Sequence, residues 1–212
     1  MARLIHRGAE AEVYEADAWG MPAVEKRRIE KAYRHPELDW RIRTSRTRLE
    51  ARILMRLKER GVRCPAVLDV WGDTLLLERV SGPTLLDLLS GGRWKADTGR
   101  LAGVMEDLGR QVGLMHSAGV VHNDLTPLNV VVTRERACLI DFGLGEFSKS
   151  EEDMAVDLHV LKKSLEALFP EAAEGLFESF LRGYRDNAPK PDATLARLEA
   201  VERRGRYRSW VG

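Results

Sequence analysis

Short apolar stretches separated by turn residues dominate the first 80 residues, and this pattern predicts β-strands. We expect two strands around a turn in residues 3–19, a strand at residues 23–26, and two strand-like runs on either side of Trp71-Gly72-Asp73. The tripeptide Ser81-Gly82-Pro83 then breaks the pattern. The first part of the chain is therefore expected to consist mainly of short strands.

Apolar residues at helical spacing mark several other segments. Residues 43–61 carry leucine and isoleucine every four positions and end at a glycine, and residues 101–119 carry a longer apolar stripe and end in the same way. A helix rich in leucine and valine is expected to begin at Asp157, and a last helical stretch precedes the tail RRGRYRSWVG. Stripes of this kind are typical of helices that face a core, so we assign them to the core.

Charge is balanced in total but unevenly placed along the 212 residues, a length that suits one domain or two small lobes. The chain has 34 Lys and Arg against 33 Asp and Glu. Residues 26–60 contain thirteen Lys or Arg and five acids, whereas residues 146–178 contain nine acids and three bases. This dipolar pattern favours oriented docking with a charged partner.

The two cysteines, Cys64 and Cys138, are far apart in the sequence and lie in apolar surroundings, so they imply neither a disulfide framework nor a metal site. No apolar run reaches the roughly 18 residues of a membrane span. The N-terminus MARLIHRG also lacks the apolar centre of a signal peptide. We therefore expect a protein of the reducing cytoplasm that does not enter a membrane.

The stretch HNDLTPLNVVVTRERACLIDFG places three oxygen-bearing side chains at the spacing of a phosphoryl-transfer site. It matches the catalytic-loop pattern H-x-D-x-x-x-x-N with Asp124 and Asn129, and the metal-binding pattern D-F-G with Asp141. A nucleoside triphosphate brings Mg2+ with its phosphates, and Mg2+ takes hard oxygen ligands while it keeps several waters. Asn129 and Asp141 can supply two of these oxygens.

Between the two patterns, VVVT and ACLI are expected to form a hairpin around RERA, which brings the two motifs together. Asp124 would then face an attacking hydroxyl or water as a base or an orienting group. An isolated aspartate or asparagine in a turn is usually only a cap. Both patterns occur here in the right order, with twelve residues from Asn129 to Asp141, which favours the catalytic interpretation.

A lysine and a glutamate upstream complete this pattern. The segment AVEK resembles the strand that ends in a phosphate-contacting lysine, and this makes Lys26 the candidate. Glu50 follows 24 residues later on an expected helix, where an ion-pairing glutamate would hold the ammonium group in place. The alternative is that Glu50 is a solvated helix residue paired with Arg43 or Arg46.

The turn near the N-terminus matches the glycine-rich pattern G-x-G-x-x-G-x-V only in part. With Val13 as the valine, the glycine positions fall on His6, Gly8 and Ala11, and a plain hairpin fits the same residues. Residues 78–80 lie where a hinge between two lobes would offer main-chain groups to an adenine. The expected cofactor-binding residues are Gly8, Ala11, Val13, Lys26, Glu78, Val80, Asn129 and Asp141.

Two segments are unusually basic: KRRIEKAYRHPELDWRIRTSRT, which Pro36 interrupts, and the C-terminal tail. A charge run is normally a solvated face. Aromatic residues interleave with the arginines in both segments, however, and this combination suits RNA. Tail arginines could also meet a partner subunit or bring a cation to the phosphate site. The candidate RNA or partner contacts are Arg41, Arg43, Arg46, Arg48, Arg206 and Arg208.

These motifs resemble the protein-kinase superfamily, and several stretches are similar to one branch of it, the p53-related kinase family, which is the minimal kinase subunit of the KEOPS complex. The similar stretches run nearly from end to end: GAEAEVY, EKRRIEKAYRHPELDWRIRTSRTRLEA, VVHNDLTPLNVV, IDFGL followed by EDMAVDL, and RGRYRSWVG. A free-standing chain of this length looks like the archaeal form of the family.

The resemblance implies a small two-lobed α+β fold, with an antiparallel sheet and one C-helix in residues 1–80 and a reduced, mainly helical lobe in residues 81–212. It implies that ATP and Mg2+ are bound for serine/threonine phosphorylation or ATP hydrolysis. It also implies action with the threonylcarbamoyltransferase subunit and other KEOPS subunits on tRNA, in making N6-threonylcarbamoyladenosine. By motif, the catalytic base would be Asp124, the phosphate-holding pair Lys26 and Glu50, and the metal ligands Asn129 and Asp141.

The sequence departs from ordinary kinases at two positions of the catalytic loop. Asn123 stands where an arginine would pair with a phosphorylated activation loop, and Thr126 stands where a lysine would stabilise the γ-phosphate. The stretch between Gly143 and Asp157 is also short and is followed by no A-P-E, so it cannot build a platform for an extended peptide. This favours an ATP-hydrolysing, partner-coupled subunit whose nucleophile is water or a serine of the chain itself.

Other interpretations of the same motifs belong to different classes. A RIO-like protein kinase or a small-molecule phosphotransferase would share the catalytic motifs but would not account for YRHPELD or the tail. A non-catalytic RNA- or protein-docking module on a kinase fold would have no need of the full set Lys26, Glu50, Asp124, Asn129 and Asp141.

Overall fold

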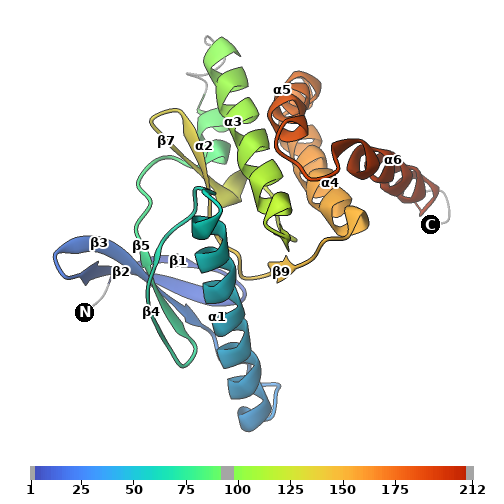
Figure 1. The fold of residues 1–212 in the computed structure, drawn as a ribbon. Coiled ribbons are helices and arrows are strands. Elements are labelled where there is room, and N and C mark those ends of the chain that lie inside the picture. Colours follow the sequence, from blue (N-terminus) through green and yellow to red (C-terminus); the bar gives the residue numbers. More distant parts are fainter. Residues whose placement is uncertain (1–2, 92–97, 209–212) are drawn as a thin grey trace.

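The computed structural model describes residues 3–91 and 98–208. The first half is a five-stranded antiparallel sheet in the order β1-β2-β3-β5-β4, and the long helix α1 lies beside it (Figure 1). The strands are β1 (Leu4–Arg7), β2 (Ala11–Ala18), β3 (Met21–Arg28), β4 (Val67–Trp71) and β5 (Thr74–Glu78).

Helix α1 (Pro36–Glu59) begins at Pro36 and not at residue 43 as the apolar pattern predicts. Proline suits the first turn of a helix, because its fixed φ is helical and its missing N–H would have no helical partner there. The acidic residues of this turn also complement the helix dipole. Pro36 therefore opens the helix, which carries Glu50 on the buried face together with Ile53 and Leu57.

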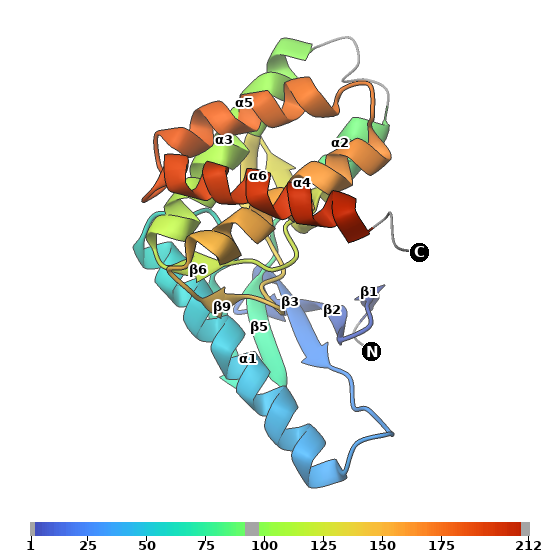
Figure 2. The same cartoon turned by 90° about the vertical axis from the view of Figure 1, so that its right-hand side faces the viewer.

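Helices make up most of the second half of the chain, and they stack above the sheet (Figure 2). They are α2 (Leu85–Ser90), α3 (Thr98–Ser117), α4 (Glu151–Leu168), α5 (Ala173–Arg185) and α6 (Pro191–Arg208). Helix α3 packs on α5, and α4 packs on α6. One buried apolar cluster extends from α1 and the sheet into these helices.

Glycines allow α3 and α5 to approach each other closely. A Cβ atom on Gly109 would lie 1.9 Å from the carbonyl oxygen of Phe180, and a Cβ on Gly183 would lie 1.8 Å from that of Glu106. No side chain fits at these distances, so the two backbones pack directly on each other. This contact fixes α3 against α5, and the catalytic loop follows directly after α3 and the short strand β6 (Val120–Val121).

Helix α4 begins at Glu151, with Ser150 as its N-cap, and not at Asp157 as the sequence pattern predicts. The hydroxyl of Ser150 accepts the main-chain N–H of Asp153 at 3.3 Å. Serine at the cap and acids in the first turn are typical of helix starts, so the signal lay about two turns before Asp157. Asp157 is instead fully buried in the second turn, and only residues 144–150 separate Gly143 from the helix.

Five short elements surround the catalytic motifs. Strands β7 (Val130–Thr133) and β8 (Arg136–Leu139) form the hairpin that the sequence predicts, with positive φ at both turn residues, Arg134 and Glu135. The 3-10 turn η2 (Pro127–Asn129) precedes this hairpin. Strand β6 (Val120–Val121) precedes the two motifs in the sequence and β9 (Glu146–Phe147) follows them, and these two strands pair with each other.

Helix α6 extends into the basic tail, so the first tail residues are helical and not a loose end. Arg204 pairs with Glu152 of α4 at 2.8 Å. For Arg206 and Arg208 the structure describes the helical backbone but not the side chains. Trp210 lies outside the described residues. Within the described part of the chain, no helix is both long and apolar enough to cross a membrane.

Candidate active site

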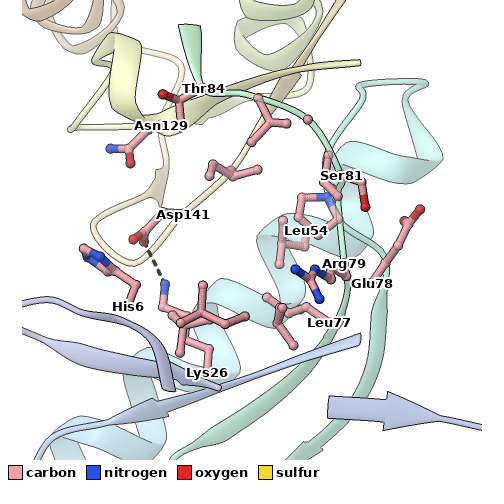
Figure 3. Close-up of a pocket in the computed structure, with 18 of the residues that line it drawn as sticks. His6, Lys26, Leu54, Leu77, Glu78, Arg79, Ser81, Thr84, Asn129 and Asp141 are labelled. Carbon is pink, nitrogen blue, oxygen red and sulfur yellow. Dashed lines mark hydrogen bonds and ion pairs between the residues drawn. The ribbon is translucent and has the colours of Figure 1, made fainter. Parts of the chain in front are cut away.

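A cavity of about 550 Å³ lies between the sheet and the helical half. Figure 3 shows Lys26 on one wall, Asp141 and Asn129 on the opposite wall, and the segment from Glu78 to Ser81 along one side. The sequence places these residues far apart, and the fold brings them to a single opening. Its size suits a small-molecule ligand or cofactor.

Lys26 lies at the centre of an ion cluster. Its Nζ atom donates to Glu50 Oε1 at 2.6 Å and to Asp141 Oδ1 at 2.7 Å. Lys26 and Glu50 are both buried, whereas about half of the Asp141 side chain is exposed. The alternative of a solvated Glu50 paired with Arg43 or Arg46 is therefore not what the structure shows.

This cluster raises the pKa of Lys26 and lowers the pKa of Asp141, and both shifts favour the charged form of the side chain. Burial works to lower the pKa of Lys26, but the Glu50 and Asp141 carboxylates outweigh it, so the pKa lies above its ordinary value. Burial works to raise the pKa of Asp141, but the Lys26 charge, its hydrogen bond and the Gly143 N–H outweigh it and lower the pKa. Both groups are thus charged over the physiological range.

Asp124 and Asn129 are joined directly. The side-chain amide of Asn129 donates to Asp124 Oδ2 at 2.8 Å and to the Asp124 carbonyl at 2.9 Å. These two bonds use the amide nitrogen, and they orient the side chain of Asn129 at the end of η2. Asn129 and Asp141 both line the cavity, and Asp124 lies beside them through Asn129.

Asp157 of α4 binds the main chain of the catalytic loop, a role that the sequence analysis did not predict. Its carboxylate accepts the main-chain N–H groups of His122 and Asn123, each at 2.7 Å. The same carboxylate lies 3.2 Å from His116 Nε2 on α3. Buried carboxylates are retained only with such partners. The isolated acid within an apolar helix was the available signal.

The backbone carries strain at the same two loops. Asn123 and Asp141 have backbone φ values of 63° and 59°. These values lie in the left-handed region, which residues other than glycine adopt infrequently. Asn123 is held there by its N–H bond to Asp157, and Asp141 by its bonds to Lys26 and to the Gly143 N–H. Strain of this kind persists only where surrounding contacts determine the conformation.

The oxygen ligands at this opening suit Mg2+ that arrives with a phosphate group. The described residues contain no group of three or more His, Cys, Asp or Glu that could hold a metal alone. Asp141 and Asn129 offer two hard oxygens, and Mg2+ is commonly bound by one or two protein ligands with substrate phosphates and waters completing its shell. The residues present therefore fit this ion.

The expected nucleotide-loop residues are only partly at the cavity. Val13, Glu78 and Val80 line it, but Gly8 and Ala11 are not among its lining residues; His6 and Ile5 of β1 are. Gly8 N–H donates to the Ala11 carbonyl at 2.9 Å, which closes the turn. In addition, Lys31 Nζ donates to the carbonyl of Ala9 and holds this turn from outside.

The basic residues of α1 divide into two kinds. Arg43 is paired with Asp39 at 2.6 Å and also with Asp73, so it has a structural role. Arg41, Arg46 and Arg48 are exposed. Arg41 and Arg48 line a second hollow beside α1, together with Trp40 and Met55 of the helix and Val70 of β4.

Comparison with known proteins gives a consistent family. The RIO domain model matches residues 22–164. The KEOPS complex subunit Bud32 of Pyrococcus abyssi is 38% identical over 223 residues, which cover 99% of each chain. A probable bifunctional tRNA threonylcarbamoyladenosine biosynthesis protein of Methanospirillum hungatei is 40% identical over 201 residues. That match covers 95% of the present chain but only 36% of the longer relative.

Among solved structures, the Rio2 kinase of Chaetomium thermophilum in its ADP/Mg2+-phosphoaspartate complex aligns with a TM-score of 0.60. The alignment covers 95% of this chain and 70% of that chain, at 17% identity, so it shows a shared fold. Together with the antiparallel sheet and the helical second half, it confirms the predicted kinase-like α+β fold.

Proposed function

Because the chain belongs to the RIO-domain family and to its Bud32 members, the KEOPS complex subunits, we propose that it uses ATP and Mg2+ as a serine/threonine kinase or ATPase. This activity is proposed to support N6-threonylcarbamoyladenosine modification of tRNA. The threonylcarbamoyltransferase subunit and the other KEOPS subunits are its proposed partners. The proposed compartment is the cytoplasm, where two free buried thiols such as Cys64 and Cys138 stay reduced.

The observation that carries this proposal is the meeting of Lys26, Glu50 and Asp141 in one cavity with Asn129. These residues come from β3, α1, the segment after β8 and η2. A charged lysine held by a buried carboxylate and open to a cavity is suited to binding phosphate oxygens. A purely structural ion pair would have no reason to face such an opening beside a strained aspartate.

Each residue has a proposed task in phosphoryl transfer. Lys26 binds the α- and β-phosphates, and Glu50 orients it. Asn129 and Asp141 hold Mg2+, which neutralises charge on the phosphate oxygens when it is bound. Asp124 accepts a hydrogen bond from the attacking hydroxyl or water and aligns it, while Asn129 fixes the aspartate side chain. Adenine is proposed to bind along the segment from Glu78 to Val80.

The short segment 144–150 supports a small acceptor. Helix α4 begins immediately after it, and its only strand, β9, pairs with β6 and leaves no extended platform for a peptide. We propose that the attacking nucleophile is water or a serine of the chain, and that partner subunits stimulate turnover.

Turnover of radiolabelled ATP, with and without the transferase subunit and tRNA, tests the proposal. Asp141→Ala should abolish Mg2+-dependent nucleotide binding. Asp124→Asn should leave binding intact and slow turnover by about 10²–10⁴-fold, the range expected for a lost general base. Equal turnover by wild type and Asp124→Asn would contradict the assignment of Asp124. Arg27→Met, at an exposed position of the same strand as Lys26, is the control.

The exposed arginines of α1 are proposed contacts for tRNA phosphates or for a partner, together with Arg206 and Arg208. Charge reversal of Arg41, Arg46 and Arg48 should weaken tRNA binding, and each lost contact should flatten the slope of log K against log salt by about 0.7–0.9. Arg43→Glu serves for comparison, because its pairing with Asp39 and Asp73 predicts lower stability instead. An unchanged slope after the triple reversal would leave these residues as a solvated face.

A further inference from the structure

A second cation contacts Glu50 from the same strand as Lys26. Arg28 lies two residues further along β3, so both side chains point to the same side of the sheet. Arg28 Nη2 donates to Glu50 Oε2 at 2.8 Å, whereas Lys26 uses Oε1. The same Nη2 lies 3.4 Å from the carbonyl oxygen of Gly143. Glu50 therefore carries one cation on each carboxylate oxygen.

Gly143 lies next to both cations and to the Asp141 carboxylate, whose Oδ1 would be 3.0 Å from an added Cβ atom. A Cβ atom at Gly143 would lie 3.4 Å from Lys26 Nζ and 3.6 Å from Arg28 Nη2. The glycine that follows Asp141 and Phe142 therefore lies against both positive charges. Arg28 thus links three parts of the site that come from β3, α1 and the segment after β8.

The charges of the cluster balance as two cations against two carboxylates: Lys26 and Arg28 against Glu50 and Asp141. Phosphate binding by Lys26 and metal binding by Asp141 would give these two residues new partners. Glu50 is only 1% exposed, and a buried carboxylate that loses its partner is strongly destabilised. Arg28 is always charged and is not among the residues that line the cavity. It can therefore stay paired with Glu50 while Lys26 and Asp141 bind new partners.

We propose that Arg28 is a positioning residue that acts as a permanent counter-charge for Glu50 and thereby leaves Lys26 free to bind phosphate. The proposal rests on the nucleotide binding proposed above. Arg28 also holds α1 toward the cavity, because it bonds both to Glu50 of this helix and to the carbonyl of Gly143. Asn123 stands in the loop where an arginine could otherwise pair with a phosphorylated segment.

A purely structural role explains the site less well. Arg28 is 6% exposed, and its Nε atom is buried without a hydrogen-bond partner. Burying a cation with an unsatisfied donor is costly, and an apolar side chain in such a position is often neutral or stabilising. An arginine kept here at that cost is better accounted for by what its charge does to Glu50 and Lys26.

The test compares Arg28→Met, Arg28→Gln and Arg28→Lys with wild type, and Arg27→Met is the matched control on the exposed side of β3. Affinity for ATP with Mg2+ is measured by calorimetry, and turnover and thermal midpoint are measured in parallel. We expect kcat/KM to fall about 10- to 100-fold in Arg28→Met and Arg28→Gln, the scale of a misplaced catalytic group. Arg28→Lys should recover part of this loss, and Arg27→Met should match wild type.

A double-variant comparison separates positioning from packing. If Arg28 acts through Glu50, then Arg28→Gln should reduce nucleotide affinity in the wild type but cause little further loss in a Glu50→Gln background. Additive losses, or wild-type affinity and turnover in a folded Arg28→Gln, would overturn the proposal. A wild type that binds ATP without turnover would count against the proposed activity alone, because the affinity comparison still decides the role of Arg28.

Discussion

The carboxylate of Asp157 accepts the main-chain N–H of His122 at 2.7 Å, and both residues are fully buried. A helix in the second half of the molecule thus holds the backbone of the catalytic loop directly. The neighbouring N–H of Asn123 bonds to the other oxygen of the same carboxylate. The left-handed conformation of Asn123 therefore depends on a residue 34 positions away in the sequence.

Asp157→Ala should lower both stability and turnover. The substitution leaves the buried N–H of His122 and the partly buried N–H of Asn123 without acceptors, at a cost of about 1–3 kcal/mol for the buried group and less for the other. Differential scanning calorimetry and ATP turnover on the same preparation measure the two effects. Glu166→Gln, an exposed position on the same helix, is the control and should change neither. Full turnover by a folded Asp157→Ala would show that the loop keeps its conformation without this carboxylate.

Gly109→Ala should be one of the most destabilising small substitutions in the chain. The added methyl group would meet the carbonyl of Phe180 at 1.9 Å, so α3 and α5 must separate. Gly103→Ala lies on the same helix with nothing within 4 Å of the added atom, and it should stabilise by about 0.4–1 kcal/mol. Urea unfolding of the two variants compares them. Similar midpoints would show that the helices accommodate the methyl group without cost.

The two cysteines should resist alkylation in the folded protein. Burial raises the pKa of Cys64 to about 12 and that of Cys138 to about 11, so the reactive thiolate is rare at pH 8. Mass spectrometry after iodoacetamide treatment should show unmodified protein, and both thiols should react once the chain is denatured. A small thiol in the same tube checks the reagent. Rapid labelling of either residue in the native state would contradict the burial.

The link between Lys26 and Asp141 should depend on acid pH. The pKa of Asp141 is lowered in the folded state, so its stabilising contribution is present above the unfolded value of about 3.9 and is lost as pH falls through the folded pKa. The difference in unfolding free energy between wild type and Asp141→Asn should therefore be constant from pH 5 to 8 and change below pH 4. A difference that is the same at pH 3 and pH 7 would show that Asp141 has no such shift.

Short contiguous motifs account for what the sequence predicted of the site. Lys26, Asp124 and Asp141 each follow from a pattern a few residues long, and the fold brings Lys26 and Asp141 within hydrogen-bond distance. Arg28 could not be singled out, because it lies in a run of basic residues and its partner is 22 residues away. Only the contact with Glu50 in the folded structure identifies Arg28 as part of the site.

Cap and break residues account for the errors in the predicted elements. Pro36 was expected to interrupt a solvated basic segment, whereas it opens α1. The stretch rich in leucine and valine predicts a helix start at Asp157, whereas Ser150 is the N-cap. Both residue types have two opposite uses, and only the packing of the surrounding segments decides between them.

The loop between β3 and α1 connects the turn at residues 8–10 to the start of α1. Asp39 is buried, pairs with Arg43 and accepts the N–H of Lys31, whose own side chain bonds to the Ala9 carbonyl. A continuous chain of hydrogen bonds and ion pairs therefore links the turn at residues 8–10, the loop at residues 29–35 and the first turns of α1. A displacement of the start of α1 would therefore reach the turn at residues 8–10, which lies next to His6 in the lining of the cavity.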